Sequence, residues 1–209
     1  MLKRITSLLE DENLMASEWE KSFLKSTLSQ VSQYERELSF NQVSVLERIE
    51  EQNTPEIRQE NEEFRKLWES DAQLRERTIV VCRYYEFTEY YRPLTFKILE
   101  TDYAPTKREY NKLCKNKYAL RVLEEHYKEP RFKVNNLVQI RAANTINKNL
   151  RSANGGWTRL NDAYALVIEV NALPIRRSAK GAKIYKILPV GGNRTYYVHE
   201  SDLKKPRKQ

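Results

Sequence analysis

The sequence predicts an α+β protein in which an N-terminal helical region, residues 1–130, precedes a small β-barrel, residues 131–209. Glycine supports this division, because the first 154 residues contain none and are rich in Glu, Lys, Arg and Leu, which favour helices. Charge supports it too. Residues 1–130 hold 21 basic and 25 acidic side chains, whereas residues 131–209 hold 16 and 4. The net charge of +8 therefore belongs to the last part of the chain.

Length and composition exclude several classes of protein. With 209 residues the chain is long enough for one large domain or two small ones, and 11% aromatic residues are too many for a disordered chain. Cys82 and Cys114 have no nearby Cys or His partner, so we expect reduced, buried or half-buried thiols rather than a disulfide or a zinc module. No apolar run is long enough to span a membrane, and the first residues do not resemble a secretory signal. We expect a soluble, cytoplasmic protein.

Capping signals predict the first helices, in a module over residues 14–52 and a charged connector over residues 54–77. Ser17 with Glu20, and Ser39 with Gln42, have the spacing of capping boxes, and Pro55 suits the first position of a third helix. Apolar residues follow at helical spacing: Trp19, Phe23, Leu24, Leu28 and Val31, then Val43, Leu46 and Ile49, then Phe64, Leu67, Trp68 and Leu74. The density of charge over residues 47–76 predicts a helix that is largely exposed to solvent.

Residues 78–128 are rich in tyrosine and predict three further helices. The first ends near Thr88, the second begins near Arg92, and the third runs from Thr106, with Glu109 as its capping partner, through Leu123. The mixture of aromatic and basic side chains has two interpretations. It is typical of a helical-bundle core whose tyrosine hydroxyls reach the rim, and it also fits a surface on which single-stranded nucleic acid stacks.

The helical region also resembles segments of tailed-phage proteins. Trp19-Glu20, Phe23-Leu24, Leu38-Ser39, Gln42 and Leu46 are similar to a helical module found beside replication and recombination domains, and Tyr84-Tyr85, Tyr90-Tyr91, Pro105 and Asn116-Lys117-Tyr118-Ala119 are similar to segments from large lytic phages, including those of cyanobacteria. The resemblance implies a phage origin, a host-cell cytoplasmic location and a nucleic-acid context. It carries no catalytic residue.

After Pro130 the pattern changes to the alternation of β-strands. Residues 132–141 place Val138 and Ile140 inward, with Gln139 and Arg141 outward. Residues 163–170 place Tyr164, Leu166, Ile168 and Val170 on one face. Further strands are predicted over residues 182–188 and 195–199, and a tight turn over residues 200–203 leads into a short last strand. Five short strands with glycine at the turns predict a small barrel.

This second region resembles an SH3-like barrel of the KOW or Tudor-like kind over about residues 131–205. The resemblance rests on Phe132-Lys133-Val134, Leu137-Val138, Ile140-Arg141, Tyr185-Lys186-Ile187-Leu188 and Val198-His199-Glu200-Ser201-Asp202-Leu203. Asn135-Asn136 replaces the usual Gly-Asp, and asparagine tolerates positive φ better than most residues. Such barrels bind RNA, DNA, ribosomes, polymerases or peptides, so the resemblance selects no single ligand.

Basic loops beside the predicted strands provide the candidate binding residues. A basic surface with an exposed aromatic side chain can neutralise phosphates and stack a base. An acidic protein partner and simple solubility remain alternatives. The candidate residues for nucleic-acid binding are Arg141, Lys148, Arg151, Trp157, Arg159, Arg176, Arg177, Lys180, Lys183 and Arg194.

The sequence offers no catalytic constellation. The basic region has only four carboxylates, Asp162, Glu169, Glu200 and Asp202, and neither His126 nor His199 has the spacing of a nucleophilic or zinc site. We therefore expect a non-enzymatic accessory protein with no cofactor or metal, and give a metal-dependent nuclease little weight. DNA or RNA is the expected partner. The alternative is an adaptor or virion assembly protein that contacts phage or host proteins through its helices.

Overall fold

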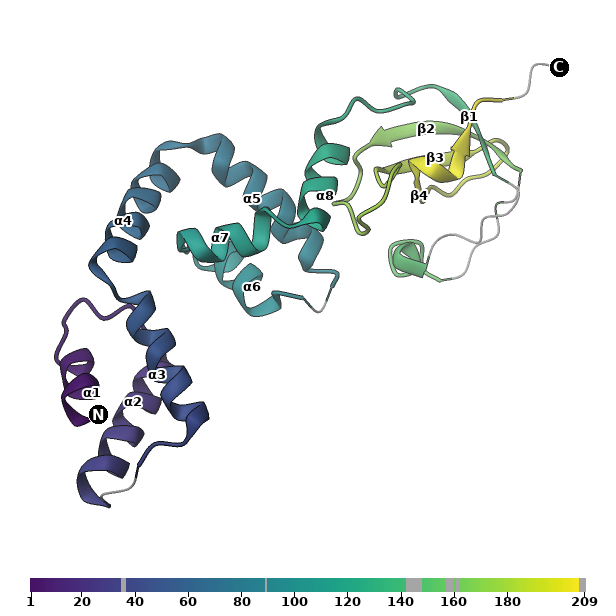
Figure 1. The fold of residues 1–209 in the computed structure, drawn as a ribbon. Helices are drawn as coiled ribbons and strands as arrows, with labels where there is room; N and C mark the ends of the chain where they lie inside the picture. Colours follow the sequence, from purple (N-terminus) through teal and green to yellow (C-terminus); the bar gives the residue numbers. More distant parts are fainter. Residues whose placement is uncertain (35–36, 89, 142–147, 157–159, 161, 207–209) are drawn as a thin grey trace. The chain divides into compact units, whose positions relative to one another are not determined.

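The fold was analysed in a computed structural model, which describes residues 1–34, 37–88, 90–141, 148–156, 160 and 162–206 (Figure 1). The chain divides into two compact units, Met1–Leu67 and Trp68–Gln209. Within the described residues there are eight α-helices, followed by five β-strands. The protein is therefore α+β, with its helices first, as predicted.

The first unit is built on helices α1 (Leu2–Leu9), α2 (Glu18–Gln33), α3 (Phe40–Gln52) and most of α4 (Pro55–Ser70). Its core consists of five aliphatic side chains that come from three helices: Ile5, Leu8, Leu24, Leu46 and Ile49. The starts of α2, α3 and α4 agree with the predicted capping and proline signals. Helix α1 was not predicted, because Met1 precedes it and provides no side-chain cap.

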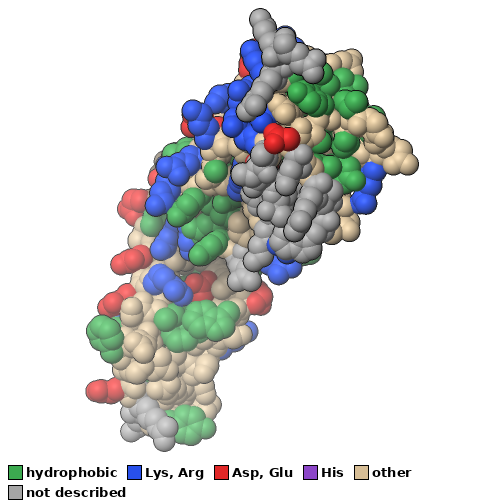
Figure 2. All heavy atoms as spheres, turned by 90° about the vertical axis from the view of Figure 1, so that its right-hand side faces the viewer, with side chains coloured by type: hydrophobic (Ala, Val, Ile, Leu, Met, Phe, Trp, Pro, Cys, Tyr) green, Lys and Arg blue, Asp and Glu red, His purple; other side chains and the backbone are tan. Residues whose placement is uncertain are grey.

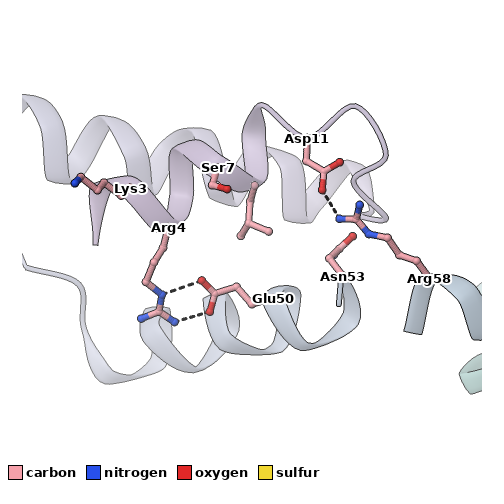
Figure 3. Close-up of a pocket in the computed structure, with 8 residues that line it drawn as sticks. Lys3, Arg4, Ser7, Asp11, Glu50, Asn53 and Arg58 are labelled. Atoms are coloured by element: carbon pink, nitrogen blue, oxygen red, sulfur yellow. Dashed lines mark hydrogen bonds and ion pairs between the residues drawn. The ribbon is translucent and has the colours of Figure 1, made fainter. Parts of the chain in front are cut away.

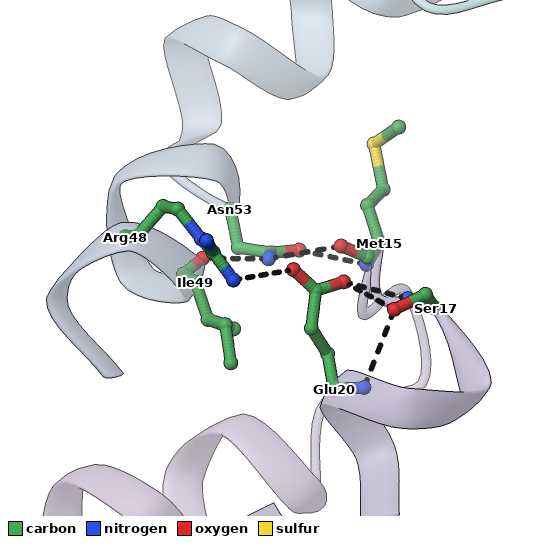
Figure 4. Close-up of polar contacts among 6 residues, drawn as sticks. All are labelled: Met15, Ser17, Glu20, Arg48, Ile49 and Asn53. Carbon is green, nitrogen blue, oxygen red and sulfur yellow. Dashed lines mark hydrogen bonds and ion pairs between the residues drawn. The ribbon is translucent and has the colours of Figure 1, made fainter. Parts of the chain in front are cut away.

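Polar contacts around one end of α3 hold this unit together (Figure 4). The Asn53 side chain accepts a hydrogen bond from the Met15 backbone N–H at 2.7 Å and donates to the Ile49 carbonyl at 2.8 Å. Glu20 closes the capping box at Ser17 and also lies 3.5 Å from the Arg48 guanidinium. Because Asn53 is buried, these bonds satisfy polar atoms that water does not reach.

The second unit begins with helices α5 (Ala72–Tyr85), α6 (Arg92–Glu100), α7 (Lys107–Cys114) and α8 (Lys117–Tyr127). Two predicted helices are each divided in two. The Asp71 side chain caps α5 by accepting from the Leu74 N–H, and the Asn116 side chain caps α8 by accepting from the backbone N–H groups of Tyr118 and Ala119. Because each cap begins a new helix, it divides the longer helix that apolar spacing alone predicts.

The core of these helices contains both cysteines and part of the tyrosine cluster. Cys82 and Cys114 are buried free thiols, as predicted, and burial raises the pKa of Cys82 to about 12 and that of Cys114 to about 11. Tyr84 and Tyr85 are buried, and the Tyr85 hydroxyl donates to Asn116 Oδ1 at 3.1 Å. The bundle-core interpretation therefore holds for these two tyrosines.

The last part of the second unit is a curled, five-stranded antiparallel sheet (Figure 1). Its strands are β1 (Leu137–Ile140), β2 (Tyr164–Val170), β3 (Ile184–Pro189), β4 (Tyr196–His199) and β5 (Leu203–Lys204), in the spatial order β4-β3-β2-β1-β5. A 3₁₀ turn over Glu200–Asp202 leads from β4 into β5, as predicted. Asn135 has a φ of +68°, in agreement with its expected role in the turn before β1.

Two side-chain directions differ from the prediction. Gln139, expected to face outward, is 7% exposed, and its side-chain amide donates to the Asp162 carbonyl at 3.4 Å. On β2 the fully buried residues are Ala165 and Val167, so the expected face of Tyr164, Leu166 and Ile168 lies on the opposite side of the strand from this core. A register shift between Val167 and Glu169 then brings Val170 against the core, which separates it from the other three residues of the expected face.

The compact units divide near residue 67, whereas the sequence pattern divides near residue 130. Residue 130 lies inside the second unit, between α8 and the sheet. Secondary structure does change there, but helix α8 is bonded to the segment between β2 and β3, as described below. The helices α5–α8 and the sheet therefore belong to one unit.

Candidate functional site

The difference in net charge is larger between the two compact units than between the helical and the β region. Residues 1–67 carry 9 basic and 14 acidic side chains, whereas residues 68–209 carry 28 and 15, which gives net charges of −5 and +13. Figure 2 shows one face of the molecule, on which Lys and Arg side chains gather along one side. The excess positive charge therefore lies in the second unit, which also carries every candidate cation.

Among the predicted cations whose side chains the structure describes, three are exposed. Arg141 follows β1, Lys180 lies between β2 and β3, and Arg194 precedes β4. Arg194 donates to the Asn154 carbonyl, and its guanidinium carbon lies 5.3 Å from the centre of the Tyr196 ring. These side chains are accessible to a phosphate, but they follow or precede different strands.

Arg176 and Arg177 are only half-exposed, because each is bound to the protein. The Arg176 guanidinium lies over the Phe87 ring, with its carbon 4.1 Å from the ring centre, and Nη1 donates to the Asn149 carbonyl at 2.9 Å. Arg177 donates to the Gly181 carbonyl at 3.3 Å and to the Ser201 hydroxyl. Burial lowers the pKa of both guanidinium groups. Their structural contacts were not evident from the sequence.

Lys183 is buried, which contradicts its predicted role as a phosphate contact. Its side chain is 1% exposed, and its ammonium donates to the His126 carbonyl at 2.6 Å. Burial lowers the pKa of this ammonium, while Glu200 and Glu125 oppose that shift. In the sequence Lys183 looks like any other loop cation. Its burial depends on α8, which precedes it by more than fifty residues.

The remaining candidates lie in or beside the segment before β2. Lys148 begins a 3₁₀ turn, Lys148–Leu150, and Arg151 is half-buried. Trp157 and Arg159 lie outside the described residues. Next to them, the buried Asn154 amide donates to the Tyr197 carbonyl at 2.9 Å and accepts from the Tyr197 N–H at 2.8 Å. Asn154 thereby satisfies backbone groups on the edge strand β4.

Glu200 and His199 belong to buried polar contacts in the sheet region. Glu200 accepts from the Tyr185 hydroxyl at 2.7 Å and from the Arg131 N–H at 2.9 Å. His199 is fully buried, with Nδ1 3.1 Å from the Ala182 carbonyl, and burial lowers its pKa to about 4. Glu200 and His199 thus have structural positions inside the protein.

Sequence reasoning about the β region omitted cations on the neighbouring helices. The exposed ones on or beside α7 and α8 are Arg108, Lys112, Lys115, Lys117, Arg121 and Lys128. Lys112 lies 5.5 Å from the centre of the Tyr91 ring, and Lys117 lies 5.1 Å from that of Tyr118. The aromatic and basic mixture over residues 78–128 was the available signal. Exposed Tyr90 and Tyr118 agree with the stacking-surface interpretation of that mixture.

The first unit has a shallow depression between α1 and α3, but its charges bind one another (Figure 3). Arg4 donates to both Glu50 carboxylate oxygens, at 2.8 and 2.5 Å, and Arg58 donates to Asp11. These ion pairs join α1 and the turn after it to α3 and α4. The depression therefore serves the packing of the unit and offers no better candidate than the basic second unit.

Searches for other kinds of site in the described residues gave two results. No group of three or more His, Cys, Asp or Glu side chains there could hold a metal ion. None of the helices in the same part of the chain has the length and apolar character needed to cross a membrane. Comparisons of the chain with protein-family models, with curated proteins and with solved structures gave no match.

Proposed function

We propose that this chain is a non-enzymatic nucleic-acid-binding protein that contacts the phosphate backbone of DNA or RNA through its second unit, residues 68–209. The observation that carries the proposal is the difference in net charge between the two units, −5 against +13. Such an excess of Lys and Arg attracts a polyanion, and contact with phosphates releases the counterions that surround them. The resemblance to phage accessory proteins adds a replication or recombination context.

The arrangement of the sheet supports an SH3-like barrel as the finer description of this fold. The strands follow one another in the sheet, β5 pairs with β1, and a 3₁₀ turn separates β4 from β5. This order agrees with the resemblance drawn from the sequence. Barrels of that kind bind several classes of ligand, so the charge, and not the fold, supports nucleic acid.

The phosphate-binding surface that we propose combines sheet and helix residues. It keeps the exposed cations Arg141, Lys180 and Arg194, and it removes Lys183, which is buried. It adds cations of α7 and α8, such as Lys112 and Arg121. Because α8 is bonded to the sheet region, the whole second unit is needed for binding.

The test is binding of the full chain to 30-nucleotide DNA and RNA oligonucleotides, single-stranded and duplex, measured by fluorescence anisotropy at rising salt. We expect affinity at low salt that falls linearly with the logarithm of the salt concentration, with a slope that increases by about 0.7–0.9 for each phosphate contact. Absence of binding at low salt, or affinity that does not change with salt, would refute the proposal.

A protein-binding role is the second candidate, and it is favoured by exposed aromatic side chains in the first unit. Trp19 and Tyr34 are 59% and 67% exposed. Large aromatic side chains are common anchors in protein interfaces. Retention of a phage or host protein by the full chain after nuclease treatment, and its loss in Trp19→Ala, would support this role.

A further inference from the structure

Helix α8 contacts the segment that joins β2 to β3, and this contact bears on which form of nucleic acid the second unit binds, a question that rests on the proposed function. Ser178 Oγ donates to the Tyr118 carbonyl at 3.1 Å, and the Gly181 N–H donates to Glu125 Oε2 at 2.8 Å. Since Tyr118 and Glu125 are two helical turns apart, residues 178–181 run along one face of α8. We call this contact the α8 seam; Figure 1 shows α8 beside the sheet at this point.

Aromatic rings from two helices lie at the α8 seam. Phe87, just after α5, is 48% exposed and carries the Arg176 guanidinium over its ring, while Asn149 holds that guanidinium in place. Tyr118, at the start of α8, is also 48% exposed, and Lys117 lies near its ring. The guanidinium covers one face of the Phe87 ring, so the flat surface offered to a planar base there is the guanidinium plane, on which bases stack as they do on aromatic rings.

Exposed cations lie on α8 and on the segment beside it. The buried acid on α8, Glu125, is already bonded to a backbone N–H. Lys117 and Arg121 are one helical turn apart on α8, and Lys180 lies on the neighbouring segment; all three are exposed. Glu125, on the same helix, is 5% exposed and accepts the Gly181 N–H, whereas Glu124 is exposed and reduces the local positive charge. The seam therefore combines rings for bases with cations for the phosphates between them.

We propose that the α8 seam binds single-stranded nucleic acid, with unpaired bases stacked on the Arg176–Phe87 pair and on Tyr118 and the phosphates contacted by Lys117, Arg121 and Lys180. In a duplex the base faces are already stacked on one another, so only the phosphate contacts are available to it. Single strands can use both kinds of contact. The seam should therefore prefer single-stranded over duplex nucleic acid of the same length.

The experiment compares the affinities of the full chain for a 20-nucleotide oligothymidine and for a 20-base-pair duplex, using Phe87→Ala, Tyr118→Ala and the control Phe40→Ala. Phe40 is an exposed ring in the other unit. We expect Phe87→Ala and Tyr118→Ala each to weaken single-strand binding by at least about fivefold, the lower end of the effect of removing one stacked base. Duplex binding and the Phe40→Ala variant should stay within about twofold of the unchanged chain.

Further measurements separate the alternatives. Phe87→Tyr keeps a ring and should retain single-strand binding, and circular dichroism checks that the alanine variants fold. Equal losses for single strand and duplex, or no loss for either, would overturn the single-strand site while leaving the proposed function standing. No binding of either nucleic acid by the unchanged chain would refute both. If an oligoglutamate peptide binds as tightly as oligothymidine and is equally weakened by Phe87→Ala, the seam is a site for acidic peptides and our assignment is wrong.

Discussion

The two units use their charged side chains in different ways. In residues 1–67 the ion pairs lie at the surface, as between Arg4 and Glu50, and the core is a small aliphatic cluster. In residues 68–209 several ionisable groups are buried and bonded to backbone atoms, among them Glu125, Lys183 and Glu200. Other cations of the same unit are exposed.

This difference shows that net charge alone does not identify a binding surface. The second unit has a charge of +13, but Lys183 holds α8 against the sheet region and Arg177 binds loop atoms, so neither resembles the exposed Lys180. Exposure selects which cations are able to meet a ligand.

A cavity in the aliphatic core of the first unit should cause the largest loss of stability. We expect Ile49→Ala to lower the free energy of unfolding of that unit by about 2–5 kcal/mol, because the fully buried side chain leaves a cavity. Hydrogen exchange should show faster exchange in α1–α3 and no change in β1–β4. Ile79→Ala, at a 43% exposed position, is the control and should have little effect. Equal acceleration in the sheet would contradict independent cores.

Glu125 tests whether a buried carboxylate secures the α8 seam. We expect Glu125→Ala to lower the free energy of unfolding by about 1–3 kcal/mol, because it leaves the buried Gly181 N–H without its partner. Urea unfolding measures the change. The neighbouring exposed residue provides the matched control, and Glu124→Ala should stay within about 0.5 kcal/mol of the unchanged protein. Equal effects of the two variants would show that the contact contributes nothing.

A comparison of Gly181 with Gly191 distinguishes the cost of backbone strain from the cost of a steric clash. Both have positive φ, +67° and +77°, but a Cβ at Gly181 would lie 3.0 Å from the Ser201 nitrogen, whereas nothing lies within 4 Å at Gly191. We expect Gly181→Ala to destabilise the protein by about 1–3 kcal/mol and Gly191→Ala by about 1 kcal/mol. Thermal unfolding of the two variants gives the comparison. A larger loss at Gly191 would show that the turn after β3 is the more constrained of the two.

Because His199 is buried, we expect acid to lower the stability of the second unit. Burial, and then the charge of Arg177, lower its pKa from 6.5 to about 4, while Asp202 opposes the shift. The unfolded chain therefore binds more protons than the folded protein between pH 6.5 and 4, so this contribution to stability is complete above pH 6.5 and is lost as the pH falls through that range. Urea unfolding at several pH values should show the loss, and His199→Gln should reduce it. An unchanged pH dependence in that variant would exclude His199 as the cause.

The helices and strands could be predicted where the determining chemistry is local. The capping boxes at Ser17, Ser39 and Thr106 begin helices as expected, because each box depends on residues three positions apart. The caps at Asp71 and Asn116 were missed, because apolar spacing continues past them. Their side chains are suitable N-caps and were the signal that could have revealed both breaks.

The candidate site was less predictable, because it depends on contacts between residues far apart in the sequence. Nothing near Lys183 in the sequence indicates that the His126 carbonyl accepts a hydrogen bond from its ammonium, and nothing near Arg176 indicates that Phe87 lies beneath it. Local pattern shows that a side chain is basic. Whether it is buried, stacked or free is decided by how α5 and α8 pack beside the sheet region.

The most direct test of a nucleic-acid-binding surface on the second unit changes the charge of each unit by the same amount. Lys180→Glu in the second unit and Lys25→Glu in the first each replace an exposed lysine, and each lowers the net charge by two. Binding of the full chain to oligothymidine is measured by fluorescence anisotropy over a range of salt concentrations. We predict that Lys180→Glu weakens binding and reduces the salt slope, whereas Lys25→Glu leaves both nearly unchanged. Equal weakening by the two variants, or none by Lys180→Glu, would contradict a binding surface on the second unit at the α8 seam.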